Sequence, residues 1–277
     1  MREGEPWMRA GHADRGAKPS ALDTAVAQSA RVNNYWQGGK DHFAADRAAA
    51  EQALAAFPGL PAAIRAGQPW RRRVTRFLVT DGGVRQFLDL GTGLPVGETI
   101  GQMAEALQEG CRTVYVDHDP MVVAHARALL SQAEPSCGFL EADIRDTGSV
   151  LAGAAQTLDF GQPVAVILSS VLHLIPDTDD PYGMVARFMD STPPGSYLVI
   201  AHPSSDIRPK ASAGMAATLN QSVAQKRTYR DRSQVGRFFA GLDLVEPGVM
   251  PLPRWRPDSE DEARAPTMAW AGVGRKP

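Results

Sequence analysis

The sequence predicts a doubly wound α/β fold, in which a mostly parallel sheet of seven strands lies between two layers of helices and follows a helical extension. Three observations lead to this prediction. From residue 86 onward, short apolar segments typical of buried strands alternate with segments of helical periodicity. The first of these strands, Phe87–Leu90, runs directly into the glycine turn Gly91–Gly93. The last two strand-like segments are separated by the proline-rich stretch Val249–Pro257, which is typical of an antiparallel pair at a sheet edge.

The first 80 residues divide into a tail and a helical extension. Residues 1–19 lack hydrophobic periodicity and are rich in Gly, Arg and Asp, which predicts a mobile tail. Residues 20–80 form the extension, in which an ordered loop over residues 33–40, containing Gly38-Gly39, separates the first two helices. The expected helices cover roughly residues 21–30, 41–56 and 61–80.

Residues 81–277 form the sheet domain. Asp119 and Pro120 are a strong helix start, because a carboxylate can cap the first turn and proline suits the first helical position. Another helix is expected to begin at Pro95, directly after the glycine turn. The remaining helices expected near the end of the chain cover roughly residues 211–226 and 233–240. The expected strands cover residues 87–90, 113–117, 138–141, 164–169, 197–202, 242–246 and 268–273.

Composition limits the classes of partner. The chain has 277 residues and a formal net charge of −2, so it has no electrostatic footprint for nucleic acid. Its basic run Arg71–Arg73 is interpreted as a solvated helix face. Two cysteines without Cys-x-x-Cys spacing indicate neither a disulfide framework nor a metal site, and suit a reducing cytoplasm. No apolar run of about 18 residues is present, so we expect neither secretion nor a membrane span.

The glycine turn and the end of the second strand together predict an adenosine-binding site. The turn Gly91-Thr92-Gly93 lets the backbone approach a ligand closely at the carboxyl end of the first strand. Open α/β sheets bind nucleotides at this edge. Asp117 closes the second strand, where its carboxylate can accept both ribose hydroxyls.

The residues around the turn favour S-adenosylmethionine over a dinucleotide. Dinucleotide folds use Gly-x-Gly-x-x-Gly to seat a pyrophosphate on the helix amino terminus, but position 96 is Val96 and the next glycine is Gly97. The acidic Asp89 would repel a pyrophosphate, whereas it can hold the ammonium of a methionine-like tail. The alternative is a purely structural glycine turn, which only lets a helix pack closely on a strand.

These residues resemble the class I S-adenosylmethionine-dependent methyltransferases over residues 85–275. Asp89–Gly93 matches the first motif of that family, with Pro95 at the position of its usual third glycine. Asp117 matches the acidic residue at the end of the second strand. The resemblance implies a Rossmann-like methyltransferase fold that binds S-adenosylmethionine.

The resemblance also implies roles for residues after the third and fourth strands. In segment 141–144, Asp143 matches the residue that accepts from the adenine amino group, and Ile144 matches the apolar residue that packs on the ring. The segment that begins at Ser169 resembles the one beneath the methionine moiety. His118 is expected along the adenine edge, although a surface turn explains it equally well.

The chain has a closer likeness to a group of actinobacterial methyltransferases that carry an amino-terminal Gly-Gly-Lys-Asp motif and Gly-Thr-Gly-Leu-Pro. Here these motifs are found in Arg31–Phe43 and Gly91–Pro95. Tyr35, Lys40 and Asp41 in the first motif are expected to help bind the cofactor as part of a lid. A loop that only packs between helices is as good an interpretation.

The expected reaction is methyl transfer to an oxygen or nitrogen of a small-molecule acceptor. His173, just after the fourth strand, is the leading candidate for a base, and His202 at the end of the fifth strand is the second. His173 is also explained by a ring satisfied by backbone bonds or one that contacts only the cofactor. Two other functions stay open: a module that binds S-adenosylmethionine without catalysis, and an NAD(P)-dependent oxidoreductase.

Overall fold

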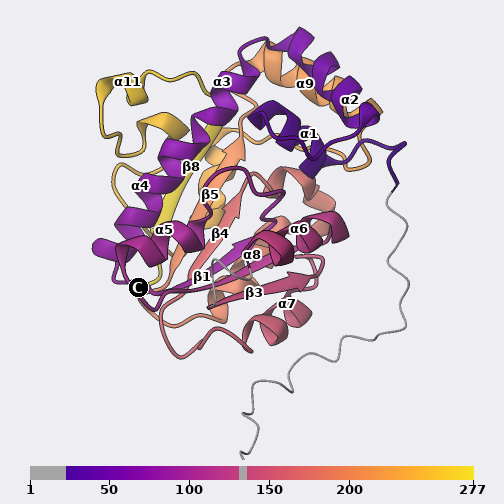
Figure 1. Cartoon of the computed structure of the whole chain (residues 1–277). Coiled ribbons are helices and arrows are strands. Elements are labelled where there is room, and N and C mark those ends of the chain that lie inside the picture. Colours follow the sequence, from indigo (N-terminus) through magenta and orange to yellow (C-terminus); the bar gives the residue numbers. More distant parts are fainter. Residues whose placement is uncertain (1–22, 131–135) are drawn as a thin grey trace, which may run out of the picture.

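The computed structural model describes residues 23–130 and 136–277, and an eight-stranded sheet forms its centre (Figure 1). The strand order is β3-β2-β1-β4-β5-β8-β6, and the short β7 pairs with β8. The expected tail at residues 1–19 lies outside the described residues. The strands are β1 Gln86–Leu90, β2 Arg112–Asp117, β3 Cys137–Glu141, β4 Ala165–Ser169, β5 Tyr197–Pro203, β6 Asp243–Leu244, β7 Met250–Pro251 and β8 Ala269–Arg275.

The sheet confirms the predicted α/β class. β1 pairs in parallel with β2 on one side and with β4 on the other, so the direction of winding reverses between β1 and β4. The β2–β3 and β4–β5 pairs are also parallel. Ligands of such sheets bind in the crevice at the carboxyl ends of the strands where the order reverses. The carboxyl ends of β1 and β4 therefore mark the place to look for a site.

The far edge of the sheet is antiparallel, as the proline-rich connection predicted. β8 lies between β5 and β6 and runs antiparallel to both. The sequence did not predict β7, because its two residues belong to the proline-rich stretch and show no alternation of apolar and polar side chains. Its pairing with β8 gives the sheet its eighth strand.

Helices cover both faces of the sheet (Figure 1). Successive strand side chains face opposite sides, so Phe87 packs with α4 and α5 while Leu88 packs with α7 and α8. None of the described helices is long and apolar enough to cross a membrane. These layers comprise α4 Gly67–Thr80, α5 Ile100–Leu107, α6 Pro120–Leu130, α7 Thr147–Ala154, α8 Pro181–Asp190 and α10 Arg232–Gly236, together with short 3-10 turns at Leu172–Leu174, Asp177–Asp179, Arg237–Phe239 and Leu252–Arg254, and α11 Glu260–Ala263.

The amino-terminal helices form a separate cluster with a helix from the second half of the chain. Figure 1 shows α1, α2 and α9 together at the top of the view. Val32, Ala50 and Leu219 share one apolar core, which joins the extension to the sheet domain. The bounds are α1 Ser29–Gln37, α2 Ala44–Ala56, α3 Leu60–Arg65 and α9 Pro209–Ser222.

Several expected helix bounds were wrong. The first helix was expected over residues 21–30, but α1 begins at Ser29 and runs to Gln37, through much of the expected 33–40 loop. It ends there because Gly38 adopts a left-handed conformation, with φ of 83°. The expected helix at 61–80 is divided into α3 and α4, and the helix expected to reach residue 226 ends at Ser222. The helix expected at 233–240 continues after Gly236 only as a 3-10 turn.

The helix after the glycine turn does not begin at Pro95. It begins at Ile100, where the Thr99 side chain accepts from the Gln102 backbone N–H and caps the helix. Gly93 and Gly97 have φ values of 68° and 76°, which interrupt any helix before that point. Residues 91–99 therefore form a loop at the carboxyl end of β1.

A fully buried ion pair joins α1 to α2. The Arg31 Nε atom lies 3.1 and 3.0 Å from the two carboxylate oxygens of Asp46, and both side chains are almost completely inaccessible to solvent. Arg31 Nη2 also donates to the carbonyls of Asp23 and Val26. Asp46 additionally accepts from the backbone N–H groups of Gln28 and Phe43. Each charge is thus surrounded by partners, which is the condition for burying it.

Asn34 and the glycine pair shape the turn after α1. The Asn34 side chain accepts from the Asp41 backbone N–H, at 2.9 Å. A Cβ atom on Gly39 would overlap the Asn34 side chain, so this position accommodates only glycine without rearrangement. This part of the motif therefore has a structural explanation.

Candidate active site

A cavity of about 550 Å³ lies at the carboxyl edge of the sheet, where the topology predicted a site. Its wall includes the loop after β1, the ends of β2 and β4, and residues of α1, α3, α4 and α9. Most of the sequence-predicted site residues meet there. Those lining the cavity are Asp89, Gly91, Thr92, Gly93, Asp117, His118, Asp143, Ile144, Ser169 and His173.

Tyr35, Lys40 and Asp41 do not line this cavity. The Tyr35 hydroxyl donates to Glu51 on α2, at 3.1 Å. Asp41 lies 3.9 Å from the His125 ring on α6. The structure brings a different set from the extension to the cavity wall, because α1 continues to Gln37. The residues of α1 in that wall are Ser29, Ala30, Asn33, Trp36 and Gln37.

The two glycines of the turn serve different purposes. Gly91, with φ of 71°, lies so close to the end of β4 that a Cβ atom would overlap the Val171 side chain. Gly93 is also left-handed, but a Cβ atom there would meet no atom of the described residues within 4 Å. Gly91 therefore permits close packing, whereas Gly93 keeps part of the cavity open.

We expect Gly91→Ala to destabilise the fold and Gly93→Ala to act mainly on ligand binding. The first substitution adds an overlap with Val171 to the strain of a left-handed alanine, whereas the second has only the strain, of about 1–2 kcal/mol. Thermal unfolding and titration with S-adenosylhomocysteine, the demethylated form of S-adenosylmethionine, measure the two effects. Equal loss of stability in both variants would contradict this assignment.

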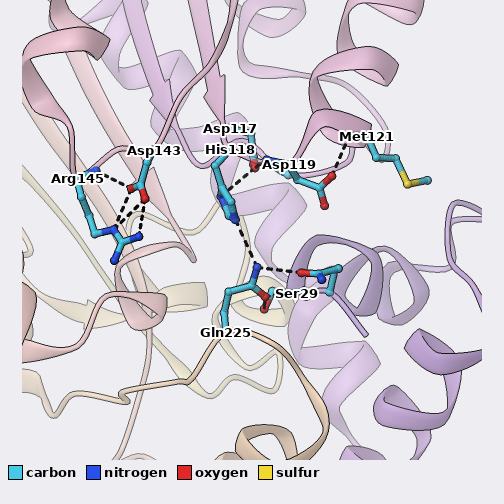
Figure 2. A network of polar contacts seen from close by, with 10 residues as sticks. Ser29, Asp117, His118, Asp119, Met121, Asp143, Arg145 and Gln225 are labelled. Carbon is cyan, nitrogen blue, oxygen red and sulfur yellow. Dashed lines mark hydrogen bonds and ion pairs between the residues drawn. The ribbon is translucent and has the colours of Figure 1, made fainter. Parts of the chain in front are cut away.

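The Asp117 carboxylate is held in a fixed orientation at the end of β2 (Figure 2). Its Oδ2 atom accepts from the Gly93 backbone N–H and its Oδ1 atom from that of Asp119, both at 3.0 Å. Burial raises the pKa of Asp117, and the two backbone hydrogen bonds oppose that rise. Each oxygen retains a further lone pair, so the carboxylate can accept two neighbouring hydroxyl groups.

His118 connects the end of β2 to the helical cluster (Figure 2). Its Nδ1 atom lies 3.6 Å from Asp117 Oδ1, and its Nε2 atom lies 3.4 Å from Gln225 Nε2. Gln225 in turn accepts from the Ser29 hydroxyl of α1, at 3.0 Å, and donates to Gln28. The chain of contacts runs along the cavity wall, since His118, Gln225 and Ser29 all line it.

Asp143 forms an ion pair that the sequence did not predict (Figure 2). Its carboxylate accepts from the side chain and the backbone N–H of Arg145, and this guanidinium lowers the pKa of Asp143. Arg145 also donates to Asp179, at 2.9 Å. The adjacent Ile144 is buried and forms part of the cavity wall.

The run Arg71–Arg73 is not the solvated face that the sequence indicated. Only Arg72 fits that description, as it forms an exposed ion pair with Glu98. Arg73 is buried against the carbonyls of Trp255 and Pro253 and pairs with Glu262. Arg71 departs most from the predicted solvated face, because it lines the cavity.

Arg71 is a site residue that sequence reasoning missed. Its guanidinium donates to Gln68, at 2.8 Å, while Gln68 donates to the Val96 carbonyl in the loop after β1. Burial lowers the pKa of Arg71, and the nearby Asp89 carboxylate opposes that effect. A cation and a carboxylate thus face the same part of the cavity, an arrangement that suits a zwitterionic amino acid group.

His173 lies in the 3-10 turn after β4 and faces the cavity. Its ring is buried, and Nδ1 has no hydrogen-bond partner among the described residues. Burial, together with the positive charge of Arg227, lowers the pKa of His173 well below 6.5. The ring is therefore neutral at physiological pH, and its Nδ1 atom is not satisfied by a backbone bond.

His202 has a structural role instead. It lies outside the cavity wall, and its Nδ1 donates to the Pro203 carbonyl, at 2.8 Å. Its Nε2 accepts from the buried Arg230, at 3.0 Å, and burial lowers its pKa to about 3. Arg230 also donates to the carbonyls of Leu172 and Ile175, which fixes the turn that carries His173.

A family model described as S-adenosyl methyltransferase matches residues 15–277. The chain belongs to this family. S-adenosylmethionine is therefore the cofactor of this methyltransferase, and the family decides against a nicotinamide-dependent oxidoreductase. No curated protein matches the chain.

Two solved structures resemble this methyltransferase along almost their whole length. A DUF574 family protein from Streptomyces avermitilis is 33% identical, with a TM-score of 0.88, 92% of this chain covered and 99% of that chain. A protein from Thermobifida fusca, solved as a candidate methyltransferase, is 35% identical, with a TM-score of 0.86, 93% of this chain covered and 98% of that chain.

A more distant structure shares the fold alone. The mitomycin 7-O-methyltransferase MmcR is 16% identical, with a TM-score of 0.52, 89% of this chain covered and 71% of that chain.

Proposed function

We propose that this methyltransferase transfers the methyl group to an oxygen or nitrogen of a small molecule that binds in the same cavity as the cofactor. The proposal rests on the two groups of residues that line that cavity, one suited to the cofactor and one suited to the acceptor. The glycine turn and Asp117 form one part of its wall, and His173 and Tyr229 form another. Tyr229 lies after α9, and its ring centroid is 6.1 Å from that of His173.

The residues at the ends of β1 to β3 are suited to the adenine, the ribose and the methionine part of S-adenosylmethionine. We assign Asp117 to the ribose hydroxyls, Asp143 to the adenine amino group and Ile144 to the face of the ring. Asp89 is suited to the methionine ammonium, and Thr92 orients it by donating to its Oδ2 atom, at 3.0 Å. The open space beside Gly93 leaves room for the methionine tail.

Arg71 completes this assignment by binding the methionine carboxylate. We expect Arg71→Met to weaken binding of S-adenosylhomocysteine about ten- to a hundredfold, because a charge-assisted hydrogen bond contributes roughly 1.5–3 kcal/mol. Arg72→Met is the matched control, since Arg72 is the exposed neighbour on the same helix. Isothermal titration of both variants measures the difference, and an unchanged affinity for Arg71→Met would remove Arg71 from the cofactor site.

The cofactor supplies a methyl group activated by its sulfonium, which leaves the protein to position the acceptor and exclude water. The acceptor oxygen or nitrogen forms a bond to the methyl carbon as the carbon–sulfur bond breaks, and the acceptor gives up a proton. His173 is suited to accept that proton, because its ring is neutral and faces the cavity. The lowered pKa keeps the ring in the base form at neutral pH, and it also makes His173 a weaker base than an exposed histidine.

We infer that α1 covers the cavity, in place of the loop that follows it. Asn33 and Gln37 lie in the cavity wall, and Ser29 is tied through Gln225 to His118 at the end of β2. Such a cover would exclude water from the reacting atoms. The extension over residues 20–80 would then act as part of the active site.

Two measurements test the proposed function. Isothermal titration should show that S-adenosylhomocysteine binds and NADH does not. Incubation with methyl-labelled S-adenosylmethionine and a panel of small phenols, alcohols and amines should give at least one labelled product. His173→Gln should lower the rate of that reaction while leaving binding of S-adenosylhomocysteine within a few-fold of the wild type. Tight NADH binding without S-adenosylhomocysteine binding would refute the proposal.

A further inference from the structure

Arg227 is a buried cation in the wall of the cavity, in the segment between α9 and α10. The residue is only 7% exposed, and Nη1 has no hydrogen-bond partner among the described residues. The backbone on either side is fixed to α9, because Arg227 N–H donates to Asn220 Oδ1, at 2.7 Å, and Asn220 Nδ2 donates to the Arg227 carbonyl. The guanidinium is thus held at the cavity, and no carboxylate in the described part of the chain balances its charge.

The other buried arginines of the described chain all have a carboxylate. Arg31 pairs with Asp46, Arg73 with Glu262 and Arg230 with Asp177. Arg227 forms no such pair among the described residues, and burial lowers its pKa. Because an uncompensated buried charge is costly, an arginine in this position indicates a ligand that brings the missing negative charge.

The neighbours of Arg227 belong to the acceptor part of the cavity. Its charge acts on the His173 ring and on the Tyr229 phenol, whose pKa is raised by burial. The Thr228 backbone N–H donates to the His173 carbonyl, at 2.7 Å, which holds this segment beside the turn after β4. A group bound by Arg227 would therefore lie close to the proposed base.

We propose that the methyl acceptor carries a carboxylate and that Arg227 binds it. This inference rests on the proposed function, since it places the acceptor beside His173. The guanidinium offers paired donors in the geometry that a carboxylate accepts. Arg227 determines substrate class in this assignment by selecting acids over neutral analogues of the same shape.

The other cations of the cavity wall explain the choice of a carboxylate over a phosphate. Arg71 faces Asp89, and Arg145 is engaged by Asp143 and Asp179. The Lys226 ammonium donates to the Asn220 carbonyl. Lys226 is exposed to solvent, so among the described residues of the wall Arg227 is the buried cation that lacks a carboxylate. One guanidinium balances the single charge of a carboxylate but not the larger charge of a phosphate monoester.

The test compares acids with their amides. The acids are acetate, benzoate and 4-hydroxybenzoate, and each is compared with its primary amide. Each compound is titrated into the protein at constant ionic strength, once with saturating S-adenosylhomocysteine and once without it. NMR measures the binding. We expect at least one acid to bind at least tenfold more tightly than its amide in the wild type. Arg227→Met should abolish this preference. Arg187→Met should retain it, because Arg187 is an exposed residue of α8 that pairs with the exposed Asp180 and lies outside the cavity wall.

Stability and cofactor affinity distinguish the remaining explanations. Without ligand, Arg227→Met should unfold at a temperature equal to or above that of the wild type, because it removes an uncompensated charge, whereas a structural arginine would lower that temperature when replaced. Arg227→Gln, which keeps polarity without charge, serves if the methionine variant fails to fold.

Four results would overturn the proposal. Two concern the acids: equal binding of every acid and its amide, or an acid preference that survives in Arg227→Met. The other two concern Arg227→Met itself: a tenfold loss of S-adenosylhomocysteine affinity, which would assign Arg227 to the cofactor, or a lower unfolding temperature without ligand, which would make Arg227 structural. Failure of the proposed function would be seen separately, as a wild type that does not bind S-adenosylhomocysteine.

Discussion

Asp46→Ala is expected to destabilise the protein by about 3–5 kcal/mol, the range found when one partner of a buried ion pair is removed. The substitution leaves the Arg31 guanidinium buried between α1 and α2 without a carboxylate. It also removes the acceptor for the backbone N–H groups of Gln28 and Phe43. Since α1 forms part of the cavity wall, loss of this pair should loosen the cover of the site as well as the fold.

Urea unfolding followed by circular dichroism measures this loss. Glu260→Ala is the matched control, because Glu260 forms an exposed ion pair with Arg264 and surface pairs contribute only about 0–1 kcal/mol. A double variant, Arg31→Met with Asp46→Leu, should recover much of the stability by replacing the pair with apolar side chains. A loss below about 1 kcal/mol in Asp46→Ala would mean that the pair is not buried in solution.

Asp117→Ala is expected to weaken binding of S-adenosylhomocysteine about ten- to a hundredfold, or roughly 1.5–3 kcal/mol. The carboxylate is already oriented by the backbone N–H groups of Gly93 and Asp119, so it would bind two hydroxyl groups without further ordering. Isothermal titration at neutral pH measures the effect. Asp190→Ala, at the exposed end of α8, is the control, and a change of less than threefold in Asp117→Ala would place the ribose elsewhere.

The same carboxylate predicts a pH dependence of binding. Burial raises the pKa of Asp117 above 3.8, so as the pH falls this group takes up a proton earlier than an ordinary aspartate. Protonation converts one acceptor oxygen into a donor and removes the negative charge. Affinity for S-adenosylhomocysteine should therefore be full well above this pKa and decline as the pH falls through it, and the decline attributable to Asp117 should be absent in Asp117→Ala.

Local sequence patterns were sufficient for seven of the eight strands of the described sheet and for much of the cavity wall. Strand composition and glycine spacing are properties of neighbouring residues, so Phe87–Leu90 and the turn after it could be recognised directly. In a parallel sheet the carboxyl ends of strands meet at one edge. For that reason Asp89, Asp117 and Asp143, each at or just after the end of a strand, could be expected together before any contact was known.

The helical boundaries were less predictable because small energetic differences decide them. The alanine-rich and polar residues of the extension are compatible with helix over a wide range, and the left-handed Gly38 sets the end of α1. Because α1 covers Ser29–Gln37 rather than residues 21–30, Asn33 and Gln37 line the cavity. Tyr35, Lys40 and Asp41 lie outside its wall. In the same way, Thr99 rather than Pro95 decided where α5 begins.

By itself, the sequence determined the α/β class, the edge of the sheet that holds the site and the acidic residues at its strand ends, because these follow from local patterns and from the geometry of parallel strands. Only the tertiary structure decided what each arginine and histidine does. Arg71, Arg72 and Arg73 are identical and adjacent, yet one faces the cavity, one faces solvent and one is buried. The role of a charged side chain depends on which distant segment supplies its partner, and that is a property of packing rather than of neighbouring residues.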